Sequence, residues 1–480
     1  MAKKYITTPI YYINANPHLG HAYASIAADI LARYYRKKGE KVYFLTGTDE
    51  HGAKNALVAE KEGISPQEFA DRQSKKFAKI SKVVNLSNDD FIRTTDPRHE
   101  KIVREFIQKL YDKKFIYKKE YEGWYCIGCE EFKTEKDLVD GCCPVHKTKA
   151  VKQKEENWFF KLSKFQGKIK DLIEKDKIKI LPKERKNEIL GKINLGLEDI
   201  SISRTGVSWG VKVPWDEKQT VYVWVDALLN YYSAPIIFGK YEFWPPDIHF
   251  VGKEIMWFHA IIWPAILLAA EESLPKIIFV HGLFSVDGHK MSKSIGNVID
   301  PKEMKDEFGT DAVRYYVMRE ISFGEDGDVS VARIKERYNN DLAAGLGNLV
   351  QRVLSMVVRY KVKVEKLPPA CKRLSAAMAG RASSFQQEKI HNLTESFKFQ
   401  EALVEIWKEI ARINKEIADT QPWQLAKDGE DKELEEFLKT KYCEILAIAD
   451  LVEPYLPETA EKIKNQAKTL KPVPIFQKIE

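Results

Sequence analysis

The chain has 480 residues, of which 44% are hydrophobic and 31% charged, a composition that suits a globular protein of roughly three domains. Its formal charge of +7 is a mild excess that permits an anionic partner without requiring one. The amino terminus has no uninterrupted apolar run for a signal peptide, and the longest apolar stretch, Ile255 to Ala270, is interrupted by His259 and Pro264, which excludes a membrane span and predicts a buried helix.

The first fifty residues predict a β-α-β unit. YITTPIYYI (5–13) has the β-branched and aromatic content of a strand, and the turn NANP follows it. Apolar residues then recur at helical spacing from Ile26 to Tyr34, before Gly39. VYFLTGTD (42–49) predicts the next strand, so we expect two parallel strands joined by a right-handed crossover.

A second set of strands is predicted later in the chain, at VYVWVDA (221–227), IHFVG (248–252) and KIIFVHGLF (276–284), with a helix over 253–270. The two sets predict an α/β fold: one doubly wound, parallel, Rossmann-like sheet, split by an insertion of roughly a hundred residues. From about Val331 onward helical patterns alternate with breaks at 367–370, 419–423 and 452–458, which predicts an α-helical bundle.

The strand ends carry the residues that suggest chemistry, because ligands bind beyond the carboxyl ends of parallel strands. PHLGH (17–21) opens a helix whose amino terminus can bind an anion, Gly20 allows close approach, and His18 and His21 can donate to phosphate oxygens. TGTDEHG (46–52) offers Asp49 to a cation such as an ammonium, and HKMSKS (289–294) follows the last strand. Each motif alone is commonly a cap or a solvated loop, but three such motifs at the strand ends of one predicted sheet favour a ligand site.

Six cysteines, four of them between Cys126 and Cys143, do not form the pattern of a secreted disulfide framework, which favours a reducing cytoplasm. Cys126-Ile-Gly-Cys129 and Cys143-Pro-Val-His146 are separated by 13 residues and predict a tetrahedral Cys₃His zinc knuckle. Cys142 could replace Cys143, but the Cys-Pro-x-His spacing favours Cys143 as the third ligand. A disulfide is the weaker alternative.

The motifs taken together resemble a known family. PHLGH resembles the first signature of class I aminoacyl-tRNA synthetases, and KMSKS (290–294) matches the second. The wider strings TPIYYINANPHLGH, LTGTDEHG, WYCIGCE and WVDALLNYYS resemble the methionyl-tRNA synthetases, of the bacterial type with a single zinc knuckle, and the resemblance covers nearly the whole chain. It implies activation of methionine with ATP to methionyl-adenylate and pyrophosphate, then transfer to the 3′-terminal adenosine of tRNA(Met), for translation initiation and elongation.

The resemblance also implies roles for residues and a division into domains. The catalytic residues would be His18, His21, Lys290 and Lys293, with Gly20 and Ser292 also at the ATP, which carries Mg²⁺. The methionine pocket would hold Ile10, Tyr12, Asp49, Trp224, Ala227, Tyr231 and His259, with Asp49 on the ammonium and the aromatic rings around the thioether. Asn348, Arg352 and Trp423 would read the anticodon. We expect residues 1–115 and 221–284 to form the catalytic domain, 116–220 the zinc insertion, 285–335 the stem-contact region and 336–480 the anticodon-binding bundle.

Some points stay open at this stage. Glu254 stands where an aspartate is common in the family and Leu228 where a proline can occur, so neither is placed in the site. Two kinds of alternative to a methionyl enzyme are considered. One is another enzyme of the same superfamily, such as a cysteinyl-tRNA synthetase or a small adenylyltransferase, and the other is a tRNA-binding protein without catalytic activity. The insertion is too short for a separate editing domain. No carboxyl-terminal dimerisation domain is expected, so the chain could be a monomer or could bind an oligonucleotide-binding-fold domain on a separate chain.

Overall fold

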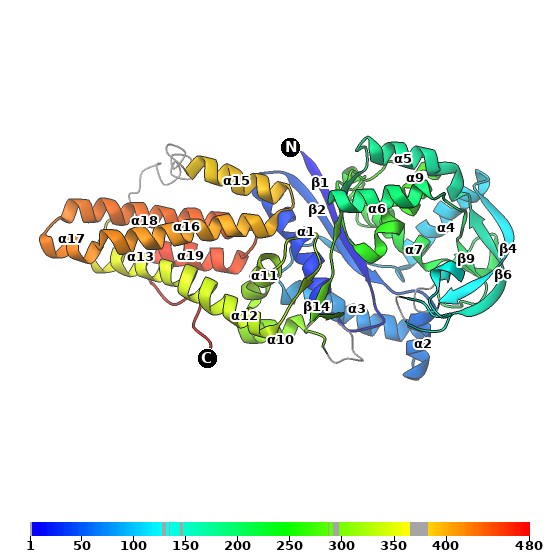
Figure 1. Ribbon diagram of the computed structural model, residues 1–480, viewed down its shortest axis with the longest axis horizontal. Helices are drawn as coiled ribbons and strands as arrows, with labels where there is room; N and C mark the ends of the chain where they lie inside the picture. Colours follow the sequence, from blue (N-terminus) through cyan, green and yellow to red (C-terminus); the bar gives the residue numbers. More distant parts are fainter. Residues whose placement is uncertain are drawn as a thin grey trace. The chain divides into compact units, whose positions relative to one another are not determined.

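The computed structural model describes residues 2–126, 131–133, 135–144, 147–286, 288–290, 297–364 and 383–480, with the side chains of residues 121, 131, 132, 290 and 383–386 outside this description. The chain divides into two compact units (Figure 1). The first consists of Met1–Pro17, Tyr35–Lys82 and Leu86–His281, and the second of His18–Tyr34, Val83–Asn85 and Gly282–Glu480. We describe each unit by itself.

The first unit is built on a six-stranded sheet in the order β3-β2-β1-β12-β13-β7, in which all neighbours are parallel. Its strands are β1 (Lys3–Tyr12), β2 (Lys41–Asp49), β3 (Asp90–Arg93), β7 (Lys179–Leu181), β12 (Ile248–Gly252) and β13 (Ile277–His281). At the centre, β1 pairs with β2 on one side and with the distant β12 on the other. This confirms the predicted parallel sheet formed by two separate parts of the sequence. One difference is that β7, from within the predicted insertion, adds the strand next to β13.

The helices of this unit include α2 (Ala53–Lys61), α3 (Pro66–Val83), α4 (Pro97–Asp112), α5 (Gln166–Glu174), α6 (Lys183–Asn194), α7 (Val223–Leu228), α8 (Asn230–Ile237) and α9 (Trp263–Ala270). The start of α4 follows from its sequence, because the Asp96 carboxylate accepts from the N–H of Arg98 and Pro97 occupies the first turn. A π-helical turn, Phe258–Ile262, precedes α9, where Pro264 lacks the N–H of a regular helix. The predicted helix over 253–270 is therefore present but irregular.

The predicted strand VYVWVDA was wrong. Only Val221 belongs to a strand, and the chain turns into α7 as the carbonyl of Tyr222 accepts from the N–H groups of Val225 and Asp226. The β-branched and aromatic residues of this run have a high intrinsic preference for strands, which is why a strand was predicted. The buried contacts of Asp226, described below, stabilise the helix instead, because strand preference is weak compared with tertiary contacts.

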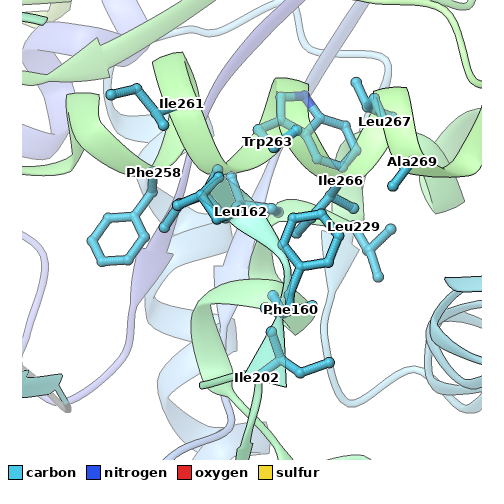
Figure 2. Packing of buried hydrophobic residues seen from close by; sticks show 14 of the residues in the cluster. Phe160, Leu162, Ile202, Leu229, Phe258, Ile261, Trp263, Ile266, Leu267 and Ala269 are labelled. Carbon is cyan, nitrogen blue, oxygen red and sulfur yellow. The ribbon is translucent and has the colours of Figure 1, made fainter. Parts of the chain in front are cut away.

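The insertion forms two small sheets beside the parallel one. One is an antiparallel sheet in the order β5-β4-β6-β8, and the other has the order β10-β11-β9. Their strands are β4 (Ile116–Cys126), β5 (Glu131–Lys133), β6 (Val151–Phe160), β8 (Ile200–Ser201), β9 (Ser203–Arg204), β10 (Lys212–Val213) and β11 (Asp216–Val221). Phe160 and Leu162 of this region pack with Trp263 and Ile266 of the α9 helix in one hydrophobic core (Figure 2). The insertion is thus anchored through apolar side chains, which supply most of the favourable free energy of such packing.

The second unit is mainly helical, which confirms the predicted helical region. Its described helices include α1 (Leu19–Lys37, whose last turn belongs to the first unit), α10 (Pro301–Phe308), α11 (Thr310–Arg319), α12 (Val331–Arg337), α13 (Asn348–Arg359), α15 (Ser383–Glu395), α16 (Phe399–Thr420), α17 (Pro422–Asp428), α18 (Asp431–Val452) and α19 (Pro457–Thr469), with a π-helix, Tyr338–Gly347, between α12 and α13. A small sheet is formed by β14 (Phe284–Val286), β15 (His289–Lys290) and β16 (Gly327–Asp328). Figure 1 shows α17 at the turn between the long helices α16 and α18.

A buried arginine ties α1 to the rest of this unit. The guanidinium of Arg314, on α11, lies 2.7 Å from the Asp29 carboxylate on α1, and both side chains are completely buried. Arg314 also donates to the carbonyls of Val84, Pro454 and Tyr455, at 2.9, 3.1 and 2.7 Å. A buried charge is tolerated only when it is paired and hydrogen-bonded, and here both conditions are met.

Candidate active site

The predicted pocket residues of the first unit begin at the carboxyl ends of β1 and β2. Tyr12 and Asp49 are register partners, and Asp49 is only 6% exposed. The register shifts between Thr7 and Ile10, around Pro9, because proline cannot donate to the ladder and is accommodated at a bulge. Ile10 packs against a separate small core cluster, whereas Tyr12 packs against the large one of Figure 2.

Three further elements, α7, α8 and the π-helical turn, carry other side chains that were predicted for the same pocket. Trp224 on α7 stacks on Phe258, with ring centroids 3.9 Å apart. On α8 the Tyr231 hydroxyl lies 2.9 Å from Nε2 of His259 in the π turn. Burial, and to a lesser extent the nearby Tyr11 and Asp49, raise the pKa of Tyr231. Tyr231 belongs to the large core cluster, against which Tyr12 and Trp224 also pack. Most of the predicted methionine residues are therefore gathered in one region.

The protonation state of His259 follows from its contacts. Its Nδ1 lies 2.9 Å from the carbonyl of Ile255 and must donate to it, so Nε2 accepts the proton of the Tyr231 hydroxyl. Burial lowers the pKa of His259 to about 4, so the ring is neutral at physiological pH. Ala227 is buried beside these groups, Leu228 lies in the apolar core, and Glu254 is exposed.

Asp226, His51 and His99 form a buried cluster that was not predicted from the sequence. The carboxylate of Asp226, on α7, is 1% exposed and accepts from two histidines. His51 Nδ1 lies 2.7 Å from Oδ2, and His99 Nε2 lies 2.9 Å from Oδ1. Burial alone would lower the pKa of His51, but Asp226 raises it to about 10. Burial alone would raise the pKa of Asp226, but His51 and His99 lower it to about 2. The cluster is therefore an ion pair at physiological pH.

Glu50 forms a second buried ion pair next to the first. Its carboxylate is completely buried and accepts two hydrogen bonds from Arg93, both at 2.8 Å. The Thr48 hydroxyl donates to it at 2.6 Å, and the Thr95 hydroxyl also contacts it. A bidentate arginine contact is directional as well as strong. Glu50 and His51 thus hold the backbone that directly follows Asp49.

The two histidines of PHLGH lie at the start of α1, in the second unit. The N–H of His18 donates to His21 Nδ1 at 3.0 Å, and the N–H of Gly20 donates to His18 Nδ1 at 3.1 Å. Because each Nδ1 accepts, the ring proton of each neutral histidine is on Nε2. Burial, and then the neighbouring His18, lower the pKa of His21 well below its usual value. The pair can therefore offer neutral N–H donors to an anion.

The second signature falls mainly outside the described residues. Ser292 and Lys293 lie outside them, and of Lys290 only the backbone is described, in β15, where it pairs with Ser285 of β14. The neighbouring His289 pairs with Val286. The motif therefore begins within β15, and the preceding run KIIFVHGLF, predicted as one strand, is divided between β13 and the start of β14.

Two of the four predicted zinc ligands, Cys126 and Cys143, lie within the described residues, and both are buried. Cys126 and Cys143 are buried, at 1% and 0% exposure, and Cys142 is partly exposed. The carbonyl of Cys143 accepts from the N–H of Lys147 at 2.7 Å. Cys129 and His146 lie outside the described residues, and in the described part no three metal-ligating side chains cluster.

The three predicted anticodon residues lie on two helices of the second unit. Asn348 is exposed at the start of α13, and Arg352, one turn later, lies 3.5 Å from the Asn414 side chain on α16. Trp423, in the first turn of α17, is 40% exposed. An exposed tryptophan at a helix start can present its ring to a partner.

Comparison with known proteins identifies the family. The family model described as "tRNA synthetases class I (M)" matches residues 4–152 and 134–354. The methionine–tRNA ligase of Caldanaerobacter subterraneus is 44% identical over 470 residues, which cover 96% of this chain and 73% of that protein. That of Thermotoga maritima is 42% identical over 471 residues, which cover 96% of this chain and 74% of that protein. The chain belongs to the methionine–tRNA ligase family.

The fold agrees with this family along nearly the whole chain. The structure of Mycobacterium tuberculosis methionyl-tRNA synthetase in complex with methionyl-adenylate matches with a TM-score of 0.89 and 37% identity, and the match covers 99% of this chain and 97% of that one. Membership of the methionine–tRNA ligases makes the chain a class I aminoacyl-tRNA synthetase, a class that catalyses an ATP-dependent ligation in protein synthesis, and excludes the cysteinyl enzyme and the small adenylyltransferase. Every helix in the described ranges falls short of the length and apolarity needed to cross a bilayer.

Proposed function

We propose that the chain activates methionine with ATP, forming methionyl-adenylate and pyrophosphate, and then transfers the methionyl group to the 3′-terminal adenosine of tRNA(Met). The observation that carries the proposal is the buried Asp49 carboxylate, close to the Tyr231–His259 pair, at the carboxyl end of a parallel strand. A carboxylate suits the ammonium of an amino acid, and neutral aromatic rings suit a polarizable thioether. The methionyl-adenylate complex of the similar Mycobacterium tuberculosis enzyme supports the same reaction.

Within this proposal Asp49 binds the ammonium of methionine. Tyr12, Trp224 and Tyr231 surround its side chain, together with Ile10, Ala227 and His259. Because His259 is held neutral and accepts from Tyr231, the wall of the pocket carries no charge that would favour a polar side chain over a thioether. Glu254 and Leu228 receive no role in binding, as one is exposed and the other is in the core.

The activation step needs charge stabilisation more than it needs a base. The methionine carboxylate is already ionised and attacks the α-phosphorus directly, while negative charge builds on the phosphates. The Nε2–H groups of His18 and His21 donate to phosphate oxygens, and Gly20 leaves room for close approach. Lys290, Lys293 and Ser292 bind the pyrophosphate from the signature loop. Mg²⁺ that accompanies ATP neutralises further phosphate charge.

A structural zinc ion is the second part of the proposal. The buried thiols of Cys126 and Cys143 fit the donor set of a Cys₃His site, with Cys129 and His146 completing it. Cys142 is partly exposed, and its backbone is bridged to Val139, which supports Cys143 as the ligand. Bound zinc would contribute folding free energy to the insertion.

Recognition of tRNA is assigned to the helical part. Trp423 would stack on an anticodon base, while Asn348 and Arg352 bond to base edges, since single-stranded bases are read by stacking and by their Watson–Crick edges. Within this proposal, residues 285–335 contact the tRNA stem and residues 336–480 form the anticodon-binding bundle. A cytoplasmic location and a separate oligonucleotide-binding chain stay predictions from the sequence.

Methionine-dependent exchange of pyrophosphate into ATP tests the first half-reaction, and aminoacylation of tRNA(Met) tests the second. We expect exchange with methionine and none above background with cysteine, valine or isoleucine, followed by charging of tRNA with a CAU anticodon. A purified, folded chain that forms no adenylate with methionine would contradict the proposed function.

A further inference from the structure

The position of Asp226 links it to the proposed methionine pocket. It lies two residues after Trp224 and directly before Ala227 on the short helix α7, so a contact that fixes Asp226 also fixes the backbone of both. Both oxygens of its buried carboxylate are occupied, one by His51 at 2.7 Å and one by His99 at 2.9 Å. Helix α7 has six residues and no side-chain cap, so such tertiary contacts must hold it in place.

The two partners of Asp226 come from the segment after β2 and from helix α4. His51 follows Asp49 by two residues, after β2, and is 2% exposed. His99 lies on α4 and its Nδ1 is 2.7 Å from the Ser233 hydroxyl on α8, the helix that carries Tyr231. The carboxylate therefore joins the segment after Asp49 to the two helices that carry the aromatic residues.

We propose that Asp226, with His51 and His99, forms a positioning cluster that sets the distance between the Asp49 carboxylate and the aromatic wall on α7 and α8, and so determines how tightly methionine binds. None of the three needs to touch methionine for this role. The inference rests on the proposed function, because it concerns the affinity of the same pocket.

The charges around His51 give the cluster a pH signature. Several charged and titratable groups surround His51. They are its chain neighbours Asp49 and Glu50, Asp226 on α7, His99 and Glu100 on α4, Arg204 on β9, Tyr125 on β4 and Tyr222 before α7. Glu100 is the second carboxylate in contact, at 3.5 Å from Nε2, and its side chain is 41% exposed. Asp226 is the partner that keeps His51 protonated at neutral pH, since burial alone would favour the neutral ring.

The sign of the pH effect follows directly. The pKa of His51 is raised, so the stabilisation that its charge provides is complete below the ordinary pKa of about 6.5, declines above that pH and is gone once pH has risen through about 10. The pKa of Asp226 is lowered, so its contribution is complete above about 4 and is lost as pH falls through about 2. In the folded enzyme His51 stays protonated and Asp226 stays ionised between pH 6 and 9, so the cluster should contribute no pH dependence to the KM for methionine in that range.

Asp226→Asn tests the cluster, because it keeps the shape of the side chain and removes the charge. Asp247→Asn is the matched control: Asp247 is a buried aspartate of the same unit that accepts from the Tyr5 N–H at 2.8 Å and from Lys276 at 2.7 Å, at the amino ends of the strands rather than the carboxyl ends. Pyrophosphate exchange gives KM for methionine, KM for ATP and kcat for each, and active-site titration corrects for inactive protein.

We expect Asp226→Asn to raise KM for methionine about tenfold or more and to leave KM for ATP within about twofold, because the change concerns one pocket. The variant should also acquire a pH-dependent KM for methionine below about pH 7, where His51 becomes protonated beside its remaining partner Glu100. Asp247→Asn should shift neither KM by more than about twofold. His51→Gln should resemble Asp226→Asn, and the double variant should be no worse than either single one.

An unchanged, pH-independent KM for methionine in folded Asp226→Asn would overturn the inference, as would equal changes in both KM values or the same changes in Asp247→Asn. If Asp226→Asn does not fold, His51→Gln decides the matter by the same criteria. Absence of exchange in the wild-type enzyme would instead overturn the proposed function, so the two failures are distinguishable.

Discussion

Trp423→Ala should separate tRNA recognition from amino-acid activation. The Trp423 side chain lies in the first turn of α17 and is 40% exposed, so part of it is accessible to a base. A stacked base contributes about 1–3 kcal/mol, which corresponds to about fivefold to 150-fold in kcat/KM. Helix α17 begins at Pro422, whose fixed backbone angle favours the first turn in the variant as well, so the backbone near the site should be retained.

The assay compares two reactions of one protein. Aminoacylation of a tRNA with a CAU anticodon should fall by that factor, while methionine-dependent pyrophosphate exchange stays close to wild type. Trp423→Phe should retain part of the effect because it keeps an aromatic face. Val473→Ala, which truncates a side chain that is 55% exposed in the same unit, is the control and should change neither reaction. Equal losses in both assays, or a lower unfolding midpoint that accounts for the loss, would show that Trp423 is a packing residue.

Three other predictions concern the clamp, the metal and the core. Lys293→Ala should lower kcat for adenylate formation severely with little change in KM for methionine, because its charge acts mainly in the transition state; a wild-type exchange rate would refute this role. Metal analysis should find about one zinc per chain, lost in Cys126→Ser and kept in Cys142→Ser, and zinc-free native protein would contradict the site. Arg314→Met should lower the free energy of unfolding by about 1–3 kcal/mol, because the buried carbonyls of Val84, Pro454 and Tyr455 lose their donor while Asp29 keeps Arg33 as a partner at 2.7 Å; denaturant titration with no change would refute this role.

Much of the fold could be predicted because its signals are local. IHFVG coincides with β12, and the breaks near 420 and 455 fall between helices of the bundle. These segments are governed by periodicity and by Pro and Gly, which operate over a few residues. VYVWVDA failed because Asp226 in it binds His51, 175 residues earlier, and no local pattern reveals such a partner.

The candidate site also combines residues with a local sequence signal and residues that only long-range contacts bring together. Asp49 and His18 could be proposed as site residues because they follow predicted strands, and the signatures around them are short and continuous. The cluster of His51, His99 and Asp226 was missed, although two of its members lie inside quoted motifs. A charged residue in an otherwise apolar stretch such as VYVWVDA is itself a signal, since a carboxylate there must be buried with a partner.

The central position of β1 has a consequence for how the chain is made. Its pairing with β2 joins residues about forty positions apart, but the Thr7–His249 contact to β12 spans 242 positions. At roughly 5–20 residues per second, a ribosome needs on the order of ten to fifty seconds between β1 and β12. During that interval one edge of β1 has no permanent neighbour, and an open strand edge can pair with other chains. The β4–β6 pairing of the insertion joins residues much closer in sequence than the β1–β12 pairing does, so it can form before β12 is synthesised. We expect nascent chains stalled before β12 to be the aggregation-prone stage of synthesis.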